Sequence, residues 1–274
     1  MDKGWGVISL LLFFFAGCGR ETPPTVADTK TVSGEPQADA VSTFSLVGHA
    51  PDGRKKWEIR GQSADLLSET VHLSPVEATA FGETKIDVTA DQGQYHKVTQ
   101  DVHLEKNVVL VTSDGMRLTT DSFQWESEKD TGRTSDWVTV TRPGMKVSGL
   151  GGLCYPKVKR VRLEKHVVVT LQGQQGQTVV TCDGPMEVDY GRRKARFWEN
   201  VLVTDSRGTI RSDRLDVALQ PQTDQIEKAS FWGHVRIQHG PQTAIAHRAN
   251  YWQPLGRTSL IGHPRIVMLP DKEG

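Results

Sequence analysis

The residues best suited to chemistry in this chain are its three cysteines and nine histidines. Cys154 and Cys182 occupy nearly matching positions in two successive sequence units. A disulfide between them is geometrically possible if their strands are neighbours, because bonded cysteines need Cα atoms roughly 4.4–6.8 Å apart and adjacent strands lie ~4.8 Å apart. An oxidising compartment would permit this bond, whereas an intervening strand would prevent it.

Three of the histidines recur at one place in a sequence repeat, which argues against a metal site. His166, His234 and His263 should point outward, and they are too far apart in sequence to form a local ligand cluster. The chain contains no nucleophile elbow, phosphate-cradling loop or Cys-x-x-Cys motif. The sequence therefore predicts a non-enzymatic protein with no catalytic residue, no cofactor and no metal.

Composition narrows the classes of partner. The 33 basic and 33 acidic residues give a formal charge of +0, so the overall field does not favour a nucleic-acid partner. An apolar fraction of 36% in 274 residues suits a soluble β-protein with much polar surface.

The N-terminal residues predict a targeting segment. An apolar run over residues 7–15 is too short to span the ~30 Å core of a bilayer as a helix, but it suits a signal-peptide core. The run ends in Phe15-Ala16-Gly17-Cys18, which resembles a bacterial lipobox and predicts lipidation of Cys18; ordinary cleavage with a spare cysteine is the alternative. We interpret residues 1–18 as the signal peptide and residues 19–42 as a flexible tether.

The elements that position these residues are best seen in FWENVLVTDSRGTIRSDRLDVAL, over residues 197–219. Its first arm alternates like a half-buried strand, a turn follows over residues 205–208, and the second arm carries Ile210 and Leu215. The five-residue step between Ile210 and Leu215 predicts a bulge in the second arm, which returns both residues to one face.

This unit recurs about every thirty residues. The second arms share the five-residue step, and an acidic residue often sits at the kink, as at Asp91, Asp121 and Asp213. We expect these side chains to bond the freed backbone amides.

Short turns favour antiparallel pairing and a long, two-walled sheet with one continuous apolar inner face. Each first arm begins at a marker tripeptide: Ser74-Pro75-Val76, Lys106-Asn107-Val108, Asp136-Trp137-Val138, Lys165-His166-Val167, Glu199-Asn200-Val201, Gly233-His234-Val235 and Gly262-His263-Pro264.

Two segments carry a family resemblance. WEIRGQSADLL, IDVTADQGQY and DVHLEKNVVLVTSDGMRLTTDSFQW resemble LptC, the membrane-anchored periplasmic component of the lipopolysaccharide exporter. The later arms LEKHVVVTL, FWENVLVTD and FWGHVRIQH are similar to the LptA or OstA family, the bridge protein of the same pathway. We therefore expect an LptC-like domain over residues 43–155 and an LptA/OstA-like domain over residues 156–270 that continues the same sheet.

The resemblance implies an all-β fold: an elongated antiparallel β-jellyroll, or β-taco, of stacked ~30-residue two-strand units. Its apolar groove would hold the acyl chains of lipopolysaccharide, and units of several proteins would stack into a bridge between the two membranes. The implied partners are the inner-membrane ABC transporter components and other OstA-like bridge proteins, which would join edge strands near Phe44 and Ile266.

The chain departs from the usual LptC pattern in two ways. A lipobox replaces the single transmembrane helix, and the body continues into LptA-like units. The expected location is periplasmic with a lipid anchor; the resemblance favours the inner membrane and leaves the outer membrane open.

The predicted lipid-binding groove is formed by the residues of each arm that the strand alternation places on the inner face. Apolar burial is worth about 25 cal/mol per Å², so an acyl chain covering ~300 Å² would gain several kcal/mol before entropy losses. Each residue could equally pack against its neighbours in a core. The predicted groove residues are Leu104, Val108, Leu110, Leu118, Val138, Val140, Leu163, Val167, Val169, Leu171, Phe197, Val201, Val203, Ile210, Leu215, Phe231, Val235 and Ile237.

Two other functions compete with lipid transport. A β-helical polysaccharide lyase or hydrolase would need carboxylates matched across neighbouring units, and the kink acids have no partner at a fixed offset. A structural or adhesive envelope lipoprotein would have a closed core and no lipid cargo, so the interior of the fold separates it from a transporter.

Overall fold

The computed structural model describes residues 42–49, 52–63, 68–82, 84–173, 176–221 and 226–267, and these residues are nearly all β. They form 19 strands and two short 3-10 helices, η1 (Pro156–Val158) and η2 (Gln253–Leu255). The predicted all-β antiparallel jellyroll class is confirmed. The predicted signal peptide, Cys18 and the tether up to residue 41 lie outside the described residues.

The chain divides into two compact units, whose described parts are residues 42–134 and 135–267. We call them the N-terminal and C-terminal units. The predicted boundary at residues 155/156 stays a prediction. The strands of the N-terminal unit are β1 (Ser42–His49), β2 (Lys55–Ser63), β3 (Thr70–Leu73), β4 (Val76–Ala80), β5 (Ile86–Ala90), β6 (Gln92–His96), β7 (Val102–Thr112), β8 (Arg117–Glu126) and the first residues of β9 (Thr131–Arg142).

The C-terminal unit contains the remainder of β9 and ten further strands. They are β10 (Met145–Tyr155), β11 (Arg160–Gly173), β12 (Gly176–Cys182), β13 (Met186–Asp189), β14 (Lys194–Asp205), β15 (Gly208–Leu219), β16 (Ile226–His239), β17 (Gln242–Trp252), β18 (Arg257–Ile261) and β19 (Arg265–Val267).

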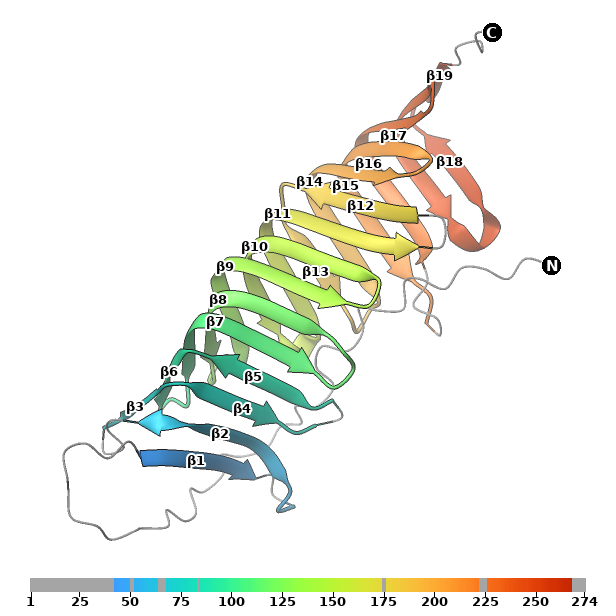
Figure 1. Cartoon of the computed structure of the whole chain (residues 1–274). Helices are drawn as coiled ribbons and strands as arrows, with labels where there is room; N and C mark the ends of the chain where they lie inside the picture. The colour runs from blue at the N-terminus through green and yellow to red at the C-terminus, as the bar shows by residue number, and fades with distance from the viewer. Residues whose placement is uncertain are drawn as a thin grey trace, which may run out of the picture. The chain divides into compact units, whose positions relative to one another are not determined.

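Each long strand takes part in two layers. Residues 109–112 of β7 pair with β5, whereas residues 102–105 of the same strand pair with β6. In the C-terminal unit, β11 pairs in the same way with β12 over one half and with β13 over the other. Within each unit, the arms therefore bend, and their halves form a front and a rear layer (Figure 1).

The bends lie at the markers of the first arms. Register shifts fall between Glu105 and Val108 and between Trp198 and Val201. The intervening pairs, Lys106-Asn107 and Glu199-Asn200, have φ values of 53° to 63°, in the left-handed region that asparagine tolerates better than most residues. The kink was predicted correctly, but its extra residue lies in the first arm and not in the second: two residues of β14 oppose the single Asp213 of β15.

Side chains clamp the bend across neighbouring strands. The carboxylate of Asp91 accepts a hydrogen bond from Asn107 Nδ2 at 2.7 Å, and that of Asp213 lies 2.8 Å from His234 Nδ1. The prediction that Asp91 and Asp213 would bond freed backbone amides is wrong. Each carboxylate instead contacts the side chain at the marker position of the next arm, Asn107 or His234. Asp183 repeats the arrangement: its carboxylate accepts a hydrogen bond at 2.6 Å from the side chain of Asn200, the marker residue of the next arm.

Prolines mark three of the bends at which an arm breaks into two strands. Pro75 separates β3 from β4, Pro185 separates β12 from β13, and Pro264 separates β18 from β19. Proline has no N–H for the ladder, so the sheet hydrogen bonds stop there. Arms with a left-handed pair, such as β7 and β14, run through the bend as one strand.

Both layers of the N-terminal unit contribute to one core. Val76, Ala90 and Val108 come from one side of the bends, and Leu73 and Leu104 come from the other. All are at most 5% exposed. The unit is therefore a two-layer sandwich whose layers are halves of the same arms.

Candidate functional site

One continuous row of apolar residues runs along the turn end of the inner face in the C-terminal unit. We call it the tip row. Each member lies directly opposite the next on the neighbouring strand, and at about 4.8 Å per strand the row extends for ~34 Å. Its members are Val147, Val169, Val180, Val203, Ile210, Ile237, Ala244 and Ile266.

Exposure rises along the tip row. Val169 and Val180 are 5% and 7% exposed, Val203 and Ile210 are half-buried, and Ile266 at the end is 59% exposed. A fully packed core would bury all of these side chains. The tip row therefore offers apolar surface that the protein itself does not cover.

A second apolar row lies in the other layer of the same unit. Its members again face one another from strand to strand, and all except the last, Leu260, are at most 6% exposed. This row forms the packed base of the inner face. It comprises Leu163, Met186, Phe197, Leu215, Phe231, Ala249 and Leu260.

The N-terminal unit has a shorter version of the tip row. Val88, Leu110 and Leu118 are directly opposite one another on β5, β7 and β8, and all three are half-buried. Leu104 and Val108 pack beneath them at 5% and 3% exposure. Each unit therefore has an apolar inner face with a buried base and a partly open rim.

The predicted groove residues divide by their burial. Those close to the bend are buried, and those close to the turns are half-buried except for the buried Val169, so the half-buried group is the one that a bound molecule could touch. Their role in lipid binding stays a prediction. The buried group is Leu104, Val108, Val138, Leu163, Val167, Val169, Phe197, Val201, Leu215, Phe231 and Val235; the half-buried group is Leu110, Leu118, Val140, Leu171, Val203, Ile210 and Ile237.

The sequence pattern missed several inner-face residues. Val180, Met186 and Val188 are buried there, but they lie in the one unit whose long turn and Pro185 break the regular spacing. Val147 was also missed, although it alternates with the buried Met145 on β10.

Arg142 is a charged residue on the inner side of β9. It continues the parity of Val138 and Val140, its Nε is buried, and it lies within electrostatic range of Tyr190. Burial lowers the pKa of Arg142, and the nearby phenol partly offsets this shift. Burial raises the pKa of Tyr190, so the phenol stays protonated and neutral.

Arg207 lies at a comparable turn but has a different setting. Its guanidinium contacts the Asp205 carboxylate at 2.5 Å and 3.0 Å, which raises the pKa of Arg207. It also bonds the side chain of Tyr251, an inner-facing residue of β17. The charge of Arg207 is thus compensated by an acid of its own turn.

The outer face of the C-terminal unit is polar and aromatic. Trp198, Arg214, Trp232 and Arg248 lie opposite one another on successive strands. The Arg248 guanidinium is 3.6 Å from the Trp232 ring centroid, and a shallow hollow of about 780 Å³ lies beside Trp198 and Arg214. The two faces of this sheet therefore differ sharply in polarity.

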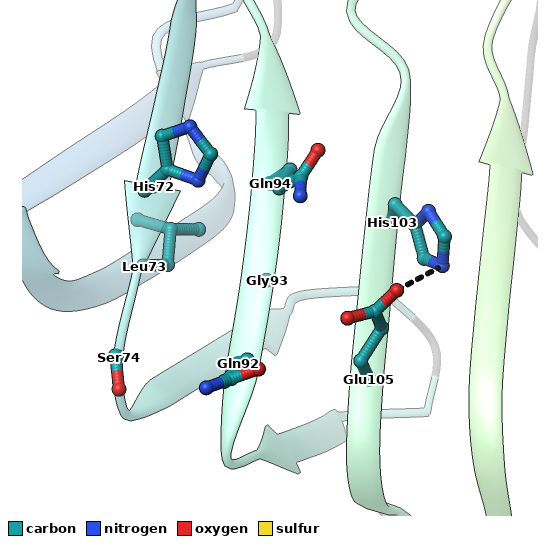
Figure 2. A pocket seen from close by; sticks show the side chains of 8 residues that line it. All are labelled: His72, Leu73, Ser74, Gln92, Gly93, Gln94, His103 and Glu105. Atoms are coloured by element: carbon teal, nitrogen blue, oxygen red, sulfur yellow. Dashed lines mark ion pairs between the residues drawn. The ribbon is translucent and has the colours of Figure 1, made fainter.

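A small hollow of about 220 Å³ lies on β3, β6 and β7 of the N-terminal unit (Figure 2). His72, Gln94 and His103 lie side by side on the three strands, and His103 Nε2 is 3.2 Å from Glu105 Oε1. Most of the residues that line it are polar or charged, so it differs from the apolar inner face.

Cys154 and Cys182 both keep their thiols in the structure. Cys154 pairs with Val161 and Cys182 pairs with Val167, so β11 lies between their strands and keeps them apart. The disulfide considered from the sequence is therefore not formed. Burial raises the pKa of the Cys182 thiol to about 11.

The described ranges contain no group of three His, Cys, Asp or Glu side chains that could hold a metal ion. His166, His234 and His263 are exposed, as the marker position predicted. A search of the same ranges for a helix able to cross a membrane also found none.

Repeated bent arms, antiparallel pairing and an apolar inner face define a β-jellyroll repeat protein. The model of the LptC-related lipopolysaccharide-assembly family matches residues 8–172, and the chain belongs to this family. A second model, of the LptA/(LptD N-terminal domain) LPS transport protein, matches residues 184–273. The predicted order of an LptC-like first half and an LptA-like second half is confirmed. A search of curated proteins found no significant match.

Proposed function

We propose that this protein is a non-enzymatic scaffold of lipopolysaccharide transport, which carries acyl chains on the partly open rim of its inner face. The tip row supports this proposal most directly, because its apolar side chains are aligned across many strands and those from Val203 to Ile266 remain half-buried or exposed. The two family matches support the same pathway for both halves of the chain.

The expected energy is sufficient for binding. At about 25 cal/mol per Å² of apolar surface, an acyl chain that removes ~300 Å² from water gains several kcal/mol. Ordering the chain offsets part of this gain. Several chains of one lipid would add their contributions, so the rim needs no charged or catalytic group to hold its cargo.

The rival function, a structural or adhesive lipoprotein, needs an interior that is closed throughout. The increase in exposure from Val169 to Ile266 favours an open rim instead. The outer tryptophan and arginine row offers no array of matched carboxylates of the kind a polysaccharide-cleaving enzyme would use.

Anchoring follows from the sequence of the targeting segment, which lies outside the described residues. We infer that Cys18 carries a lipid and that the folded units lie in the periplasm. The LptC match over residues 8–172 supports the inner membrane as the site of attachment.

Edge strands are the proposed contacts with other bridge proteins and with the transporter complex. β19 pairs with β17 on one side, and its Ile266 and Val267 are 59% and 52% exposed. A partner strand could pair with this edge and cover both side chains. β1, which pairs with β2, is the corresponding candidate in the N-terminal unit.

Lipid binding by the purified full-length protein tests the proposal. Ile210→Glu and Ile237→Glu place charges on the rim, so they should weaken the binding of fluorescent lipopolysaccharide at least tenfold. Arg211→Glu is the matched control, because Arg211 neighbours Ile210 on β15 but is exposed. Equal affinity in all these proteins, with unchanged thermal melting, would rule out the rim as the binding surface.

A further inference from the structure

Two tryptophans lie in one row on the outer face of the C-terminal unit. Trp198 of β14 pairs with Arg214 of β15, and Arg214 pairs with Trp232 of β16. Residues directly opposite one another point to the same face of a sheet, so both indoles lie on one side, about 9.6 Å apart at ~4.8 Å per strand. Trp198 is half-buried and Trp232 is 37% exposed, so both rings keep surface that a ligand can contact.

Strand pairing does not itself require aromatic residues in this row. At the matching position of the N-terminal unit, two residues before the marker asparagine, the row consists of Gln92, Glu105 and Ser122. None of these residues is aromatic, and the arms still pair with the same register shift at the bend. The tryptophans therefore give the C-terminal unit a surface property that the fold does not need.

The hollow beside Trp198 surrounds the indole with hydrogen-bonding groups. It has a volume of about 780 Å³, and its polar lining includes Arg162, Glu199, Asp213 and Arg214. Guanidiniums donate hydrogen bonds and carboxylates accept them. A pyranose ring suits such a site, because its C–H bonds form an apolar face that can stack on an aromatic ring, while its hydroxyls both donate and accept.

The charges around the hollow are balanced, which favours an uncharged ligand. Arg162 lies 3.0 Å from the Glu164 carboxylate, and Arg214 lies 2.6 Å from that of Asp216. A phosphate or an acidic peptide would have to compete with these carboxylates and would also meet Glu199 in the hollow. A neutral sugar can bond these groups without separating either ion pair.

Both indoles are held in place by their neighbours. The Cζ atom of Arg248 lies 3.6 Å from the Trp232 ring centroid and covers one face of the ring, and that of Arg214 lies 6.0 Å from the Trp198 ring centroid. All four residues lie on paired strands. Side chains that are already ordered lose little conformational entropy when a ligand binds.

We propose that this row binds an extended, β-1,4-linked glycan of uncharged pyranose rings. Successive rings of such a chain alternate in orientation, so every second ring presents the same face. Trp198 and Trp232 lie two strand spacings apart, roughly the length of two rings, and therefore stack on the first and third ring of a bound trisaccharide. The glycan strands of the cell wall have this chemistry and lie in the periplasm proposed for this protein. The inference goes beyond lipid transport, which uses the opposite face of the sheet.

Isothermal titration calorimetry of the full-length protein with oligomers of N-acetylglucosamine tests the spacing. Three rings are needed to reach both tryptophans, so chitotriose should bind about tenfold more tightly than chitobiose, which corresponds to about 1.4 kcal/mol. Maltohexaose has α-1,4 links that curve the chain, so it should bind at least about tenfold more weakly than chitohexaose.

Variants assign the binding to the row. Trp198→Ala and Trp232→Ala should each weaken the binding of chitotriose about tenfold, to the level of chitobiose, whereas Trp198→Phe should retain most of the affinity. Trp137→Ala is the matched control, because Trp137 is 54% exposed on β9 of the same unit but lies outside the row, and it should stay within about twofold of the wild type. Thermal melting confirms that each variant is folded.

The inference is overturned if chitohexaose shows no saturable binding, if chitotriose and chitobiose bind equally, or if both row variants keep the wild-type affinity. A protein that the wild type retains and Trp198→Ala loses, without any glycan binding, would also overturn it and would identify the row as a protein interface. Fluorescent lipopolysaccharide should bind Trp198→Ala as it binds the wild type, so the failure of the glycan site is distinguishable from the failure of the proposed function.

Discussion

The N-terminal and C-terminal units use the same bent arm but differ at its tip. In both, the inner face has a buried base, and the position four residues after the first buried valine of an arm lies at the rim. This position is Thr112 in the N-terminal unit, where its hydroxyl contacts Asp114 in the turn. In the C-terminal unit, the corresponding residues are Arg142, Leu171, Asp205 and His239.

This difference shows which part of the repeat is free to vary. The base residues must be apolar because they pack between the layers, whereas the tip residues face the rim and can carry charge without disrupting the core. At this position the C-terminal unit has two charged residues, Arg142 and Asp205, whereas the N-terminal unit has the neutral Thr112.

The largest effect should follow from a charge in the shared base. Val235→Asp and Val108→Asp each bury a carboxylate at sites that are 0% and 3% exposed. Each should lower the free energy of unfolding by at least about 3 kcal/mol, as measured by urea denaturation. Arg236→Asp is the control, since its exposed side chain should change stability by less than about 0.5 kcal/mol. If either aspartate variant were as stable as the wild type, the two units would not share a tightly packed base.

Replacing a turn glycine with alanine should destabilise the C-terminal unit more than the N-terminal unit. Gly208 in the β14–β15 turn has a φ of 151°, and a Cβ there would collide with the Gln238 carbonyl. Gly208→Ala should therefore cost about 2–3 kcal/mol. Gly115 in the β7–β8 turn has a φ of 86° with open space around it, so Gly115→Ala should cost only about 1 kcal/mol. Thermal melts of both variants check the order, and equal costs would refute the close approach at Gly208.

Substitution of the bend asparagine should have the same effect on stability in both units. Asn107→Ala removes the hydrogen bond to Asp91 and places alanine at a φ of 53°. Asn107→Gly removes the same bond but suits this conformation, so it should be more stable than the alanine variant by about 1 kcal/mol. Asn200 has a φ of 54° and bonds Asp183, so it should show the same order. Chemical denaturation of the four variants decides this; a reversed order in either unit would mean that the left-handed bend is not shared.

The smallest effect concerns thiol reactivity, which reports on how tightly the base is packed. Burial raises the pKa of Cys182 to about 11, so at pH 8 only about one thiol in a thousand is ionised. Cys182 should react slowly with iodoacetamide, and its rate should rise as the pH increases towards 11. Cys154, which is half-buried, should react faster at pH 8. Peptide mapping separates the sites, and faster labelling of Cys182 would contradict its burial.

Much of this fold could be predicted because the parity of each arm determines which side chains share a face. Val201 and Val203 indicated the inner face, and the spacing of Ile210 and Leu215 required a bend. The spacing could not show which arm carries the extra residue. A bulge in the first arm and a bulge in the second arm are both compatible with the same apolar pattern. Only the backbone shows that Glu199 and Asn200 take the left-handed conformation.

The candidate site was predicted less completely. Parity selected the apolar inner residues, but it could not separate the buried base from the half-buried rim, since this depends on how the two layers approach. Arg142 was missed because the search followed apolar residues, although its parity with Val138 and Val140 is visible in the sequence. Its proximity to Tyr190, 48 positions along the chain, arises only from the folding of the arms.

Site-specific photo-crosslinking in cells tests the central proposal most directly, that the inner faces of both units carry lipid. A photoreactive amino acid is placed at Leu110 and at Ile210 on the rims, and at their exposed neighbours Val111 and Arg211 as controls. Lipopolysaccharide should crosslink at Leu110 and Ile210 and be at least several-fold weaker at both neighbours. Capture at Val111 and Arg211 with none at the rim positions would contradict the account.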